Sequence, residues 1–321
     1  MNHEWRSHLD VEELPAPTPS TSRRTGCGPG GCRGGCSRDR PVSVRALVVV
    51  VVGIIGAAFM WAYWRAIVLR GPVHVLILGT DERPGEAGPF RSDTMILARF
   101  SPRGPRVALL SIPRDLWVAI PGVGENRINA AHFFGGPLLA KETVATLFEV
   151  PVHYYVKVDF DGFVRIVDAM GGIEVDVPEP LVDSKYPTPD YGVTTVRIDA
   201  GFQQMDGDVA LIYARSRYST SDFDRARRQQ QILAAMKAKL QQPGTWLRVP
   251  RIARAVVESV ETDMPLQEWP VLAMIVWRAG EVERYAIGPN EVTPTITANG
   301  ADVLLPDWEA IRRVLAQVVE E

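Results

Sequence analysis

The run Val73–Gly79, VHVLILG, is the feature that most limits the fold of this chain. It shows little alternation of polar and apolar residues, which is typical of a strand buried on both faces of a sheet. Such a strand needs helices above and below it, and helical and strand patterns alternate from Gly71 onward. The sequence therefore predicts an α/β fold over residues 71–321: a single three-layer α-β-α sandwich domain with a mixed central sheet.

Two further strands are predicted directly after the first. Thr94–Phe100 and Val107–Ile112 are separated by the turn sequence SPRGP, so we expect them to form a hairpin. The segment Pro178–Tyr191 is rich in Pro and Asp and is interpreted as a mobile lid or a surface loop. The other expected helices and strands cover Leu138–Phe148, Val152–Val158, Asp161–Met170 (ended by Gly171-Gly172), Ile173–Val177, Thr194–Ile198, a helix capped by Asp206, Ile252–Val260, Leu266–Arg278, Glu283–Ile287 and Trp308–Val319.

A long arginine-rich helix is predicted after these elements, from about Phe223 to Leu240, with Asp222 as its N-cap. At about 100° per residue, Arg225 and Gln229 fall on the face that continues as apolar core, whereas Arg227 points the opposite way. An inward cluster of cations beside a helix N-terminus suits a phosphate-bearing anion. The alternative is a solvated charged face, and we accept it for Arg227.

Ionic residues also lie where the predicted strands begin and end. Asp81 directly follows the first strand, and Asp93 begins the hairpin strands that Arg114 closes, so Asp93 and Arg114 are expected at the same end. Carboxylates hold Mg²⁺ and arginines neutralise phosphate oxygens, so this rim predicts a magnesium-assisted phosphate site. In the alternative, the two aspartates only form salt bridges with neighbouring arginines. The arginines expected near this rim are Arg91, Arg114, Arg215, Arg217 and Arg225.

The N-terminal part predicts a membrane anchor. Ala46–Trp64 contains no charged residue over 19 positions, and as a helix it would be roughly 28 Å long. Aromatic residues end this run, and arginines are more frequent before it than after it. This pattern predicts a disordered cytoplasmic tail over 1–41, a transmembrane signal anchor with a short linker over 42–70, and an extracytoplasmic domain at the cell membrane over 71–321. A cleaved signal peptide is the alternative, which the long N-terminal lead disfavours.

Several classes of function are not supported by the sequence. The net charge of −3 gives no general affinity for nucleic acid, and no zinc-finger or RNA-binding motif is present. Cys27, Cys32 and Cys36 all lie in the tail, and their C-x4-C-x3-C spacing in a Gly-rich run does not by itself indicate a metal site or lipidation. No Ser-His-Asp or Cys-His arrangement is evident, and His132 is expected to be structural.

A series of ordered motifs adds to these observations. They are LGTD (Leu78–Asp81), RSDTM (Arg91–Met95), SIPRD (Ser111–Asp115), RINAAH (Arg127–His132), GGI (Gly171–Ile173), MDGD followed by ARSR (Met205–Arg217), and SDFDRARRQQ (Ser221–Gln230). With these motifs, nearly all of residues 71–321 resemble the LytR-CpsA-Psr proteins, membrane-anchored phosphotransferases of bacterial cell-envelope assembly. One departure is Asp224, at a place often held by glycine in the family.

The resemblance implies a function and a set of site residues. The function is transfer of a glycopolymer from a polyprenyl-diphosphate carrier to peptidoglycan, at the C6 hydroxyl of N-acetylmuramic acid. Asp81 and Asp93 match the family's Mg²⁺-associated positions. The expected catalytic residues are these two aspartates together with Arg114 and Asp222. Asp222 is expected to orient arginines or to assist proton transfer. Matches to diphosphate-binding positions are Arg114, Arg215, Arg217, Arg225 and Gln229, with Arg91 and Arg228 in addition.

The resemblance also implies a place for the prenyl chain, and two other functions are alternatives to the transferase. The prenyl chain of the carrier is expected in an apolar tunnel beside the sheet, with helix Asp161–Met170 and Val209–Leu211 as its wall. The alternatives to a transferase are a polyprenyl-diphosphate phosphohydrolase, in which water replaces the sugar acceptor, and a non-catalytic lipid-carrier binder or envelope sensor.

Overall fold

In the computed structural model of this chain the described residues are 44–82, 90–188, 192–216 and 221–319. Contacts divide the chain into two units, Met1–Ile55 and Gly56–Glu321. Helix α1 covers Val44–Arg70, and β1 begins at Val73. Within the described ranges no helix has both the length and the apolar character that a bilayer crossing requires. The membrane anchor therefore stays a prediction, and the predicted tail with its three cysteines lies outside the described residues.

A six-stranded mixed sheet forms the centre of the second unit. Its strand order is β11-β6-β1-β2-β3-β12. Strands β2 and β3 pair antiparallel, which confirms the predicted hairpin, whereas β1 pairs parallel with β6 and β3 pairs parallel with β12. The strands cover Val73–Thr80 (β1), Ser92–Ser101 (β2), Arg106–Ser111 (β3), Tyr154–Asp159 (β6), Val260–Thr262 (β11) and Val282–Ala286 (β12).

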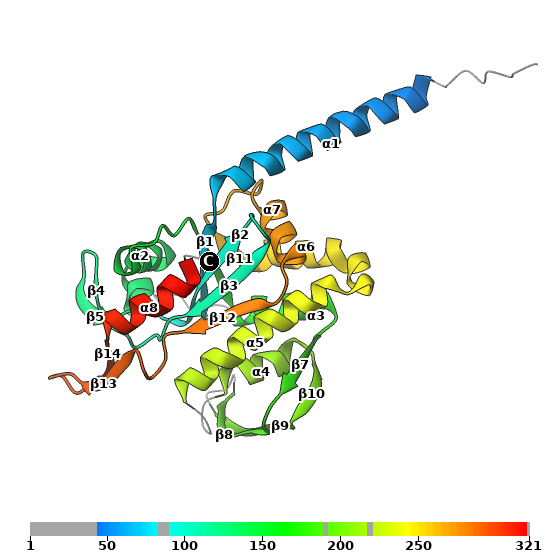
Figure 1. Cartoon of the computed structure of the whole chain (residues 1–321). Coiled ribbons are helices and arrows are strands. Elements are labelled where there is room, and N and C mark those ends of the chain that lie inside the picture. The colour runs from blue at the N-terminus through cyan, green and yellow to red at the C-terminus, as the bar shows by residue number, and fades with distance from the viewer. Residues whose placement is uncertain (1–43, 83–89, 189–191, 217–220, 320–321) are drawn as a thin grey trace, which may run out of the picture. The chain divides into compact units, whose positions relative to one another are not determined.

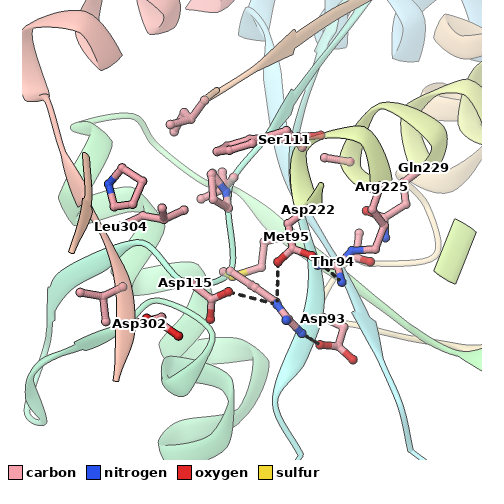
Figure 2. Close-up of a pocket in the computed structure, with 18 of the residues that line it drawn as sticks. Asp93, Thr94, Met95, Ser111, Asp115, Asp222, Arg225, Gln229, Asp302 and Leu304 are labelled. Carbon is pink, nitrogen blue, oxygen red and sulfur yellow. Dashed lines mark hydrogen bonds and ion pairs between the residues drawn. The ribbon is translucent and has the colours of Figure 1, made fainter. Parts of the chain in front are cut away.

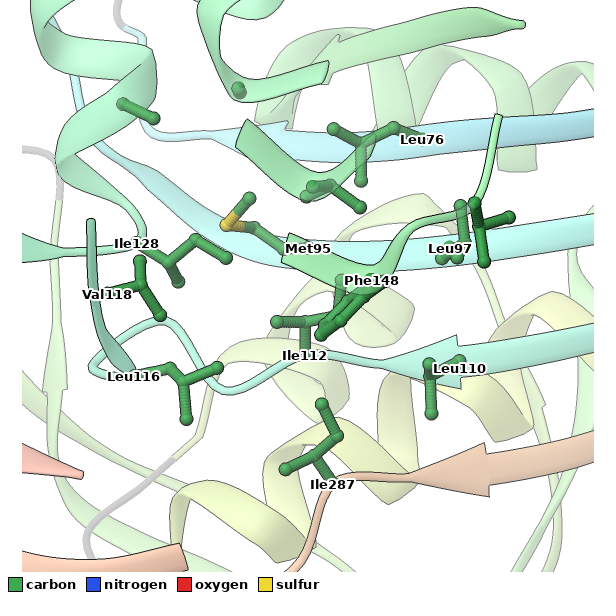
Figure 3. Packing of buried hydrophobic residues seen from close by; sticks show 14 of the residues in the cluster. Leu76, Met95, Leu97, Leu110, Ile112, Leu116, Val118, Ile128, Phe148 and Ile287 are labelled. Atoms are coloured by element: carbon green, nitrogen blue, oxygen red, sulfur yellow. The ribbon is translucent and has the colours of Figure 1, made fainter. Parts of the chain in front are cut away.

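Helices cover both faces of this sheet, as the continuous apolar run of β1 requires (Figure 1). On one face Leu76 and Leu78 are fully buried in a cluster that includes residues of α2 and α8. Figure 3 shows part of this cluster, with Leu76 of β1 and Phe148 of α2 among its labelled residues. On the other face Ile96 and Ala98 pack against α7. The three-layer α-β-α architecture is thus confirmed. The covering helices are α2 (Ala130–Phe148), α5 (Asp222–Gln241), α6 (Val249–Ser259), α7 (Trp269–Arg278) and α8 (Trp308–Val319), with the 3-10 turn η1 (Pro243–Arg248) before α6.

A smaller lobe follows β6 along the chain and has its own buried cluster. Asp206 accepts a hydrogen bond from the backbone N–H of Val209, which confirms the predicted cap, and α3 ends at Gly171, whose φ of 83° suits glycine. The lobe comprises α3 (Phe160–Met170), β7 (Ile173–Val177), β8 (Leu181–Pro187), β9 (Val193–Ile198), β10 (Gly201–Met205) and α4 (Gly207–Arg215).

The interpretation of Pro178–Tyr191 as a mobile lid or a surface loop is wrong over Leu181–Pro187. Residues Leu181–Pro187 form strand β8, which pairs antiparallel with β9. Leu181, Asp183 and Tyr186 are buried while their neighbours are exposed, so the alternation of a half-buried strand is present but is interrupted by a register shift between Asp183 and Tyr186. Residues 189–191 lie outside the described ranges.

Two small hairpins that the sequence did not predict complete the unit. They are β4 (Trp117–Ile120) with β5 (Gly124–Arg127), and β13 (Val292–Ile296) with β14 (Asp302–Pro306). The backbone N–H of Leu304 donates to the carbonyl oxygen of Asp115 over 3.0 Å. This bond attaches the C-terminal hairpin to the segment that follows β3.

Candidate functional site

The first strands place two aspartates and an arginine at one end of the sheet. Gly79 pairs with Thr94, but Thr80 pairs with Ser92, so Asp93 is the extra residue of a β-bulge in β2. A bulge re-aims the side chain it carries. The Nη1 of Arg114, just past the end of β3, donates to Oδ1 of Asp93 over 2.6 Å. The predicted proximity of these two residues is confirmed.

Arg114 has three carboxylate neighbours. Its Nε lies 3.3 Å from Oδ2 of Asp115 and 3.5 Å from Oδ2 of Asp222, in addition to the bond with Asp93. Figure 2 labels these three aspartates, and its dashed lines mark their ion pairs. Burial acts to lower the pKa of Arg114, but Asp222, Asp115 and Asp93 outweigh it, so the pKa is raised. The guanidinium is therefore a permanent cation in an acidic surrounding.

The N-terminus of α5 differs from the prediction by one residue. Ser221, rather than Asp222, is the N-cap: its hydroxyl accepts from the N–H of Asp224, and the Asp224 carboxylate accepts from the N–H of Ser221. Because this capping box satisfies the helix end, the carboxylate of Asp222 is available to bridge arginines. Its Oδ1 lies 3.2 Å from Nη1 of Arg225. Asp224, the departure from the family pattern, thus has a structural use.

Arg215 joins the group from the end of α4. Its Nη2 donates to Oδ2 of Asp81 over 3.4 Å, and its guanidinium carbon stands 4.0 Å from the ring centre of Phe160. Tyr186 of the β8–β9 hairpin contributes a second ring at 5.7 Å. Arg215 is held by one carboxylate and two aromatic rings, so its forked donors are positioned at a cavity edge.

Two of the cavities that open on these residues share part of their lining. The first, called here the rim cavity, has a volume of about 380 Å³ and is lined by Asp81, Asp93, Phe160, Asp183, Lys185, Arg215, Arg225 and Gln229, among others. The second, called the hairpin cavity, has a volume of about 570 Å³ and extends from Arg114 and Asp222 to the β13–β14 hairpin. Asp93, Arg225 and Gln229 line both cavities. These three residues stand between two approaches to the same rim.

An apolar cavity of about 290 Å³ adjoins the rim cavity. Arg215, Gln229 and Phe160 line both, while the rest of its wall is almost entirely apolar. Phe163 and Ile166 of α3 and Leu211 of α4 belong to this wall. The expectation that α3 and Val209–Leu211 border an apolar space beside the sheet is therefore confirmed for these three residues.

The helix-periodicity prediction for α5 is also confirmed. Arg225 is buried and faces the cavities, Gln229 lines three of them, and Arg227 is exposed. The face then continues through Ile232 and Met236 into the apolar cavity. A single helix face thus provides both the cationic and the apolar part of the site.

Three predicted arginines differ from the others in their placement. Arg217 lies outside the described residues. Arg91 is exposed beside the ring of Phe133 and lines none of the cavities named above. Arg228 is buried, and its Nε donates to the carbonyl oxygen of Tyr213 over 3.0 Å while Nη2 donates to that of Ser216. This placement favours a structural role for Arg228, which ties α5 to the end of α4.

The site contains side chains that the sequence reasoning missed. Asp115 supports both Arg114 and Arg127, although it was visible as the last residue of the SIPRD motif. Lys185 and Asp183 reach the rim cavity from β8, within the segment expected from the sequence to be a mobile lid or a surface loop. His132 is buried and its Nδ1 donates to the carbonyl oxygen of Phe90 over 2.7 Å, so its contacts are those of a structural residue.

A divalent cation fits this site only together with a phosphate ligand. Among the described residues, no three His, Cys, Asp or Glu side chains gather as a self-sufficient metal centre. Mg²⁺, however, is commonly bound by one or two carboxylates plus substrate phosphates. Asp81 and Asp93 line the same cavity, so the donor set is compatible with such a shared ion.

Comparison with known proteins identifies the family. The model of the LytR_cpsA_psr family matches residues 66–315. This chain belongs to that family. Among curated relatives, the polyisoprenyl-teichoic acid–peptidoglycan teichoic acid transferase TagU of Oceanobacillus iheyensis is 31% identical over 263 residues, which are 78% of this chain and 76% of TagU. TagV of Bacillus subtilis, named as the same kind of transferase, is 31% identical over 74% of this chain and 59% of its own length.

One shorter match and two solved structures add to this comparison. A Staphylococcus aureus protein is 35% identical, but the match spans 63% of this family member and about half, 51%, of the relative. The crystal structure of B. subtilis TagV superposes with a TM-score of 0.64 at 29% identity, over 78% of this chain and 98% of that one. TagT bound to LI-WTA has a TM-score of 0.62 at 24% identity, over 79% and 93% of the two chains. This last likeness concerns the fold alone.

Proposed function

We propose that this protein transfers a glycopolymer from a polyprenyl-diphosphate carrier to a hydroxyl group of peptidoglycan during cell-wall assembly. The names of its relatives TagU and TagV, which are teichoic acid transferases acting between a polyisoprenyl carrier and peptidoglycan, support this class of reaction. The acceptor that we propose is the C6 hydroxyl of N-acetylmuramic acid. Cell-wall biogenesis outside the cytoplasmic membrane is the corresponding role.

The observation that supports the proposal most is the junction of a charged cavity with an apolar one. Arg215 and Arg225 line the rim cavity, and Gln229 and Arg215 continue into the apolar cavity. A polyprenyl diphosphate has charged and apolar parts in the same order, because its two anionic phosphates are joined to a long hydrocarbon. Arginine forks bind phosphate oxygens in pairs, and the apolar wall removes hydrocarbon from water.

The reaction itself is a displacement at phosphorus. A bond forms between the acceptor hydroxyl oxygen and the phosphorus that bears the polymer, while the bond from this phosphorus to the bridging oxygen breaks and polyprenyl phosphate leaves. In such reactions the protein mainly positions the groups and stabilises negative charge. Arg114, Arg215 and Arg225 are the cations placed for that task. The hydroxyl proton passes to an oxygen of Asp81 or Asp93 that the metal ion does not hold, since both carboxylates line the rim cavity.

Mg²⁺ is the proposed cofactor, which Asp81 and Asp93 would hold together with phosphate oxygens of the substrate. When bound, it would neutralise charge on the diphosphate. Asp222, between Arg114 and Arg225, orients these two cations. We also propose that the uncharged run Ala46–Trp64 within α1 anchors the chain in the cell membrane as a signal anchor with its N-terminus in the cytoplasm.

A reconstituted transfer reaction tests the proposal. The full chain in detergent is incubated with a radiolabelled polyprenyl-diphosphate-linked glycan, Mg²⁺ and a short uncrosslinked peptidoglycan oligomer. We expect labelled glycan joined to the oligomer, release of polyprenyl phosphate, and loss of both products after chelation of Mg²⁺. The matched control omits only the peptidoglycan oligomer.

Two results would contradict the transferase. Free labelled glycan at the same rate with and without the oligomer would identify a phosphohydrolase. Carrier binding without either product, at any Mg²⁺ concentration, would identify a non-catalytic binder or sensor.

A further inference from the structure

Helix α7 has an apolar outer face. Its residues Val271 and Ile275 are buried against the sheet, as expected of a covering helix. The opposite side of the helix also lacks charge: Pro270, Ala273, Met274 and Trp277 follow the i, i+3, i+4, i+7 spacing of one face, and all four are exposed. A helix that is apolar on every side is normally covered on every side.

The apolar face continues onto the neighbouring turn η1. The ring of Trp246 packs edge-on against that of Trp277, with centroids 6.1 Å apart. Leu247 beside it is 91% exposed, and Val249 at the start of α6 is also exposed. This ring contact joins the exposed apolar residues of α7 to those of the segment 246–249, and we call them together the α7 face: Trp246, Leu247, Val249, Pro270, Ala273, Met274 and Trp277. Contiguous exposed apolar groups of this kind mark interaction sites.

Exposed basic residues follow Trp246 and Leu247 along the chain. Arg248, Arg251 and Arg254 are all exposed, although Arg254 pairs with Glu258 over 2.8 Å and the Arg248 guanidinium lies near Gly171. Helices that lie in the headgroup region of a bilayer typically combine exposed tryptophan and leucine with arginine. The α7 face and the arginines next to it along the chain have this composition. An anionic lipid surface would complement the charge.

The side of α7 that faces the protein interior also supports a lipid partner. Trp269 and Leu272 of α7 line a second apolar cavity of about 210 Å³, together with Val75 near the start of β1. Ile77, Val156, Val256 and Val260 line both this cavity and the one beside Arg215. An apolar route therefore runs from the charged rim to the helix that carries the exposed face.

We infer that the α7 face is a docking surface for the lipid bilayer, which brings the second apolar cavity against the membrane. The choice of a bilayer as the occupant rests on the proposed function, because a polyprenyl carrier resides in the membrane and must enter the apolar route from there. The exposed face itself exists independently of that function. Docking would shorten the distance over which the hydrocarbon crosses water.

Lipid-borne quenching tests this inference without any assay of activity. The full chain, with its three tail cysteines replaced by serine, is reconstituted into nanodiscs containing anionic phosphatidylglycerol. An environment-sensitive fluorophore is attached in separate samples to Leu247→Cys, to Met274→Cys and to the control Phe202→Cys. Phe202 on β10 is 79% exposed and apolar but lies on the smaller lobe. Leu247 is so exposed that its replacement does not disturb the core.

We expect blue-shifted emission and loss of most of the fluorescence to lipids spin-labelled near the headgroup at positions 247 and 274, and no change at 202. Adding Trp277→Glu should reverse the effect at position 247. Absence of quenching at 247 and 274 overturns the inference, as does equal quenching at all three positions. A blue shift without quenching by lipid also overturns it, because protein rather than bilayer then covers the face. None of these readings depends on whether the chain transfers a glycopolymer.

Discussion

The two ends of strand β1 use polar side chains in opposite ways. At its C-terminal end the guanidinium of Arg114 contacts the carboxylates of Asp93 and Asp222, and all three residues line the hairpin cavity. At its N-terminal end, His74 and His153 bind main chain: the Nδ1 of His74 donates to the carbonyl oxygen of Pro151 over 3.0 Å, and the Nδ1 of His153 accepts from the N–H of His74 over 3.1 Å. The first arrangement leaves donors and acceptors at a cavity, while the second fastens strands together.

The difference shows which polar groups at a strand end belong to a site. Side chains that bind main-chain atoms cannot exchange these partners for a ligand without exposing buried amide or carbonyl groups, which costs free energy. Side chains that bind other side chains at a cavity can move from one partner to another. Mutations at the rim should therefore change turnover more than stability, and mutations at the opposite end should do the reverse.

The largest effect is expected for Arg114→Ala. Under the proposed function Arg114 is a preorganised cation beside the transferred phosphate, so its removal should lower turnover by about 100-fold or more. Stability should change little, because the three carboxylates left behind remain accessible to solvent from the cavity. Turnover is measured with the labelled-carrier reaction and stability by urea unfolding of the same preparations.

Arg106→Ala is the matched control for this variant. Arg106 is at the start of the same strand β3 and pairs with Glu283 at the surface over 3.2 Å. Exposed pairs of this kind contribute little, so both turnover and stability should stay close to those of the unmodified chain. A loss of stability in Arg114→Ala comparable to its loss of turnover would contradict the proposed division between the two ends.

The His74 end should weaken in acid. Burial, followed by the neighbouring His153, lowers the pKa of His74 to about 4, and burial also lowers the pKa of His153. The unfolded chain protonates His74 near pH 6.5, and the folded chain only near pH 4. The contribution of neutral His74 to the free energy of unfolding is therefore fully present above pH 6.5 and is lost as the pH falls from 6.5 toward 4. For His74 alone the loss between pH 7 and pH 5 should be about 2 kcal/mol.

His74→Asn isolates this contribution, since its amide can donate to Pro151 as the imidazole does but has no proton to gain. Urea unfolding at pH 7 and pH 5 measures the change for both chains. The variant should lose less stability than the unmodified chain over this interval, by about the same 2 kcal/mol. Equal losses in the two chains would show that protonation of His74 does not limit stability.

Much of the site could be predicted from the sequence because it depends on local geometry. The hairpin placed Asp93 beside Arg114, and helix periodicity placed Arg225 and Gln229 inward. Contributions that depend on pairing between distant segments could not be predicted. Lys185 reaches the rim only because β8 forms a strand with a register shift. The β13–β14 hairpin lines the hairpin cavity although more than a hundred residues separate it from Arg114.

The N-cap of α5 gives the smallest expected effect and a test at the rim itself. Both Ser221 and Asp222 are good capping residues, and the choice between them is made by Asp224, whose carboxylate accepts from the backbone N–H and the hydroxyl of Ser221. These hydrogen bonds lower the pKa of Asp224. Ser221→Ala should reduce the free energy of unfolding by about 1 kcal/mol, and Ser221→Asp, which retains a capping oxygen, should restore most of it.

Turnover distinguishes this cap from the groups that it positions. With Ser221→Ala, Asp222 can move to the capping position and lose its contact with Arg114, so a fall in turnover is expected that is much smaller than that of Arg114→Ala. Parallel measurement of urea unfolding and glycan transfer for the two Ser221 variants gives both quantities. If Ser221→Ala left both unchanged, the capping box would not be what keeps the Asp222 carboxylate between the two arginines.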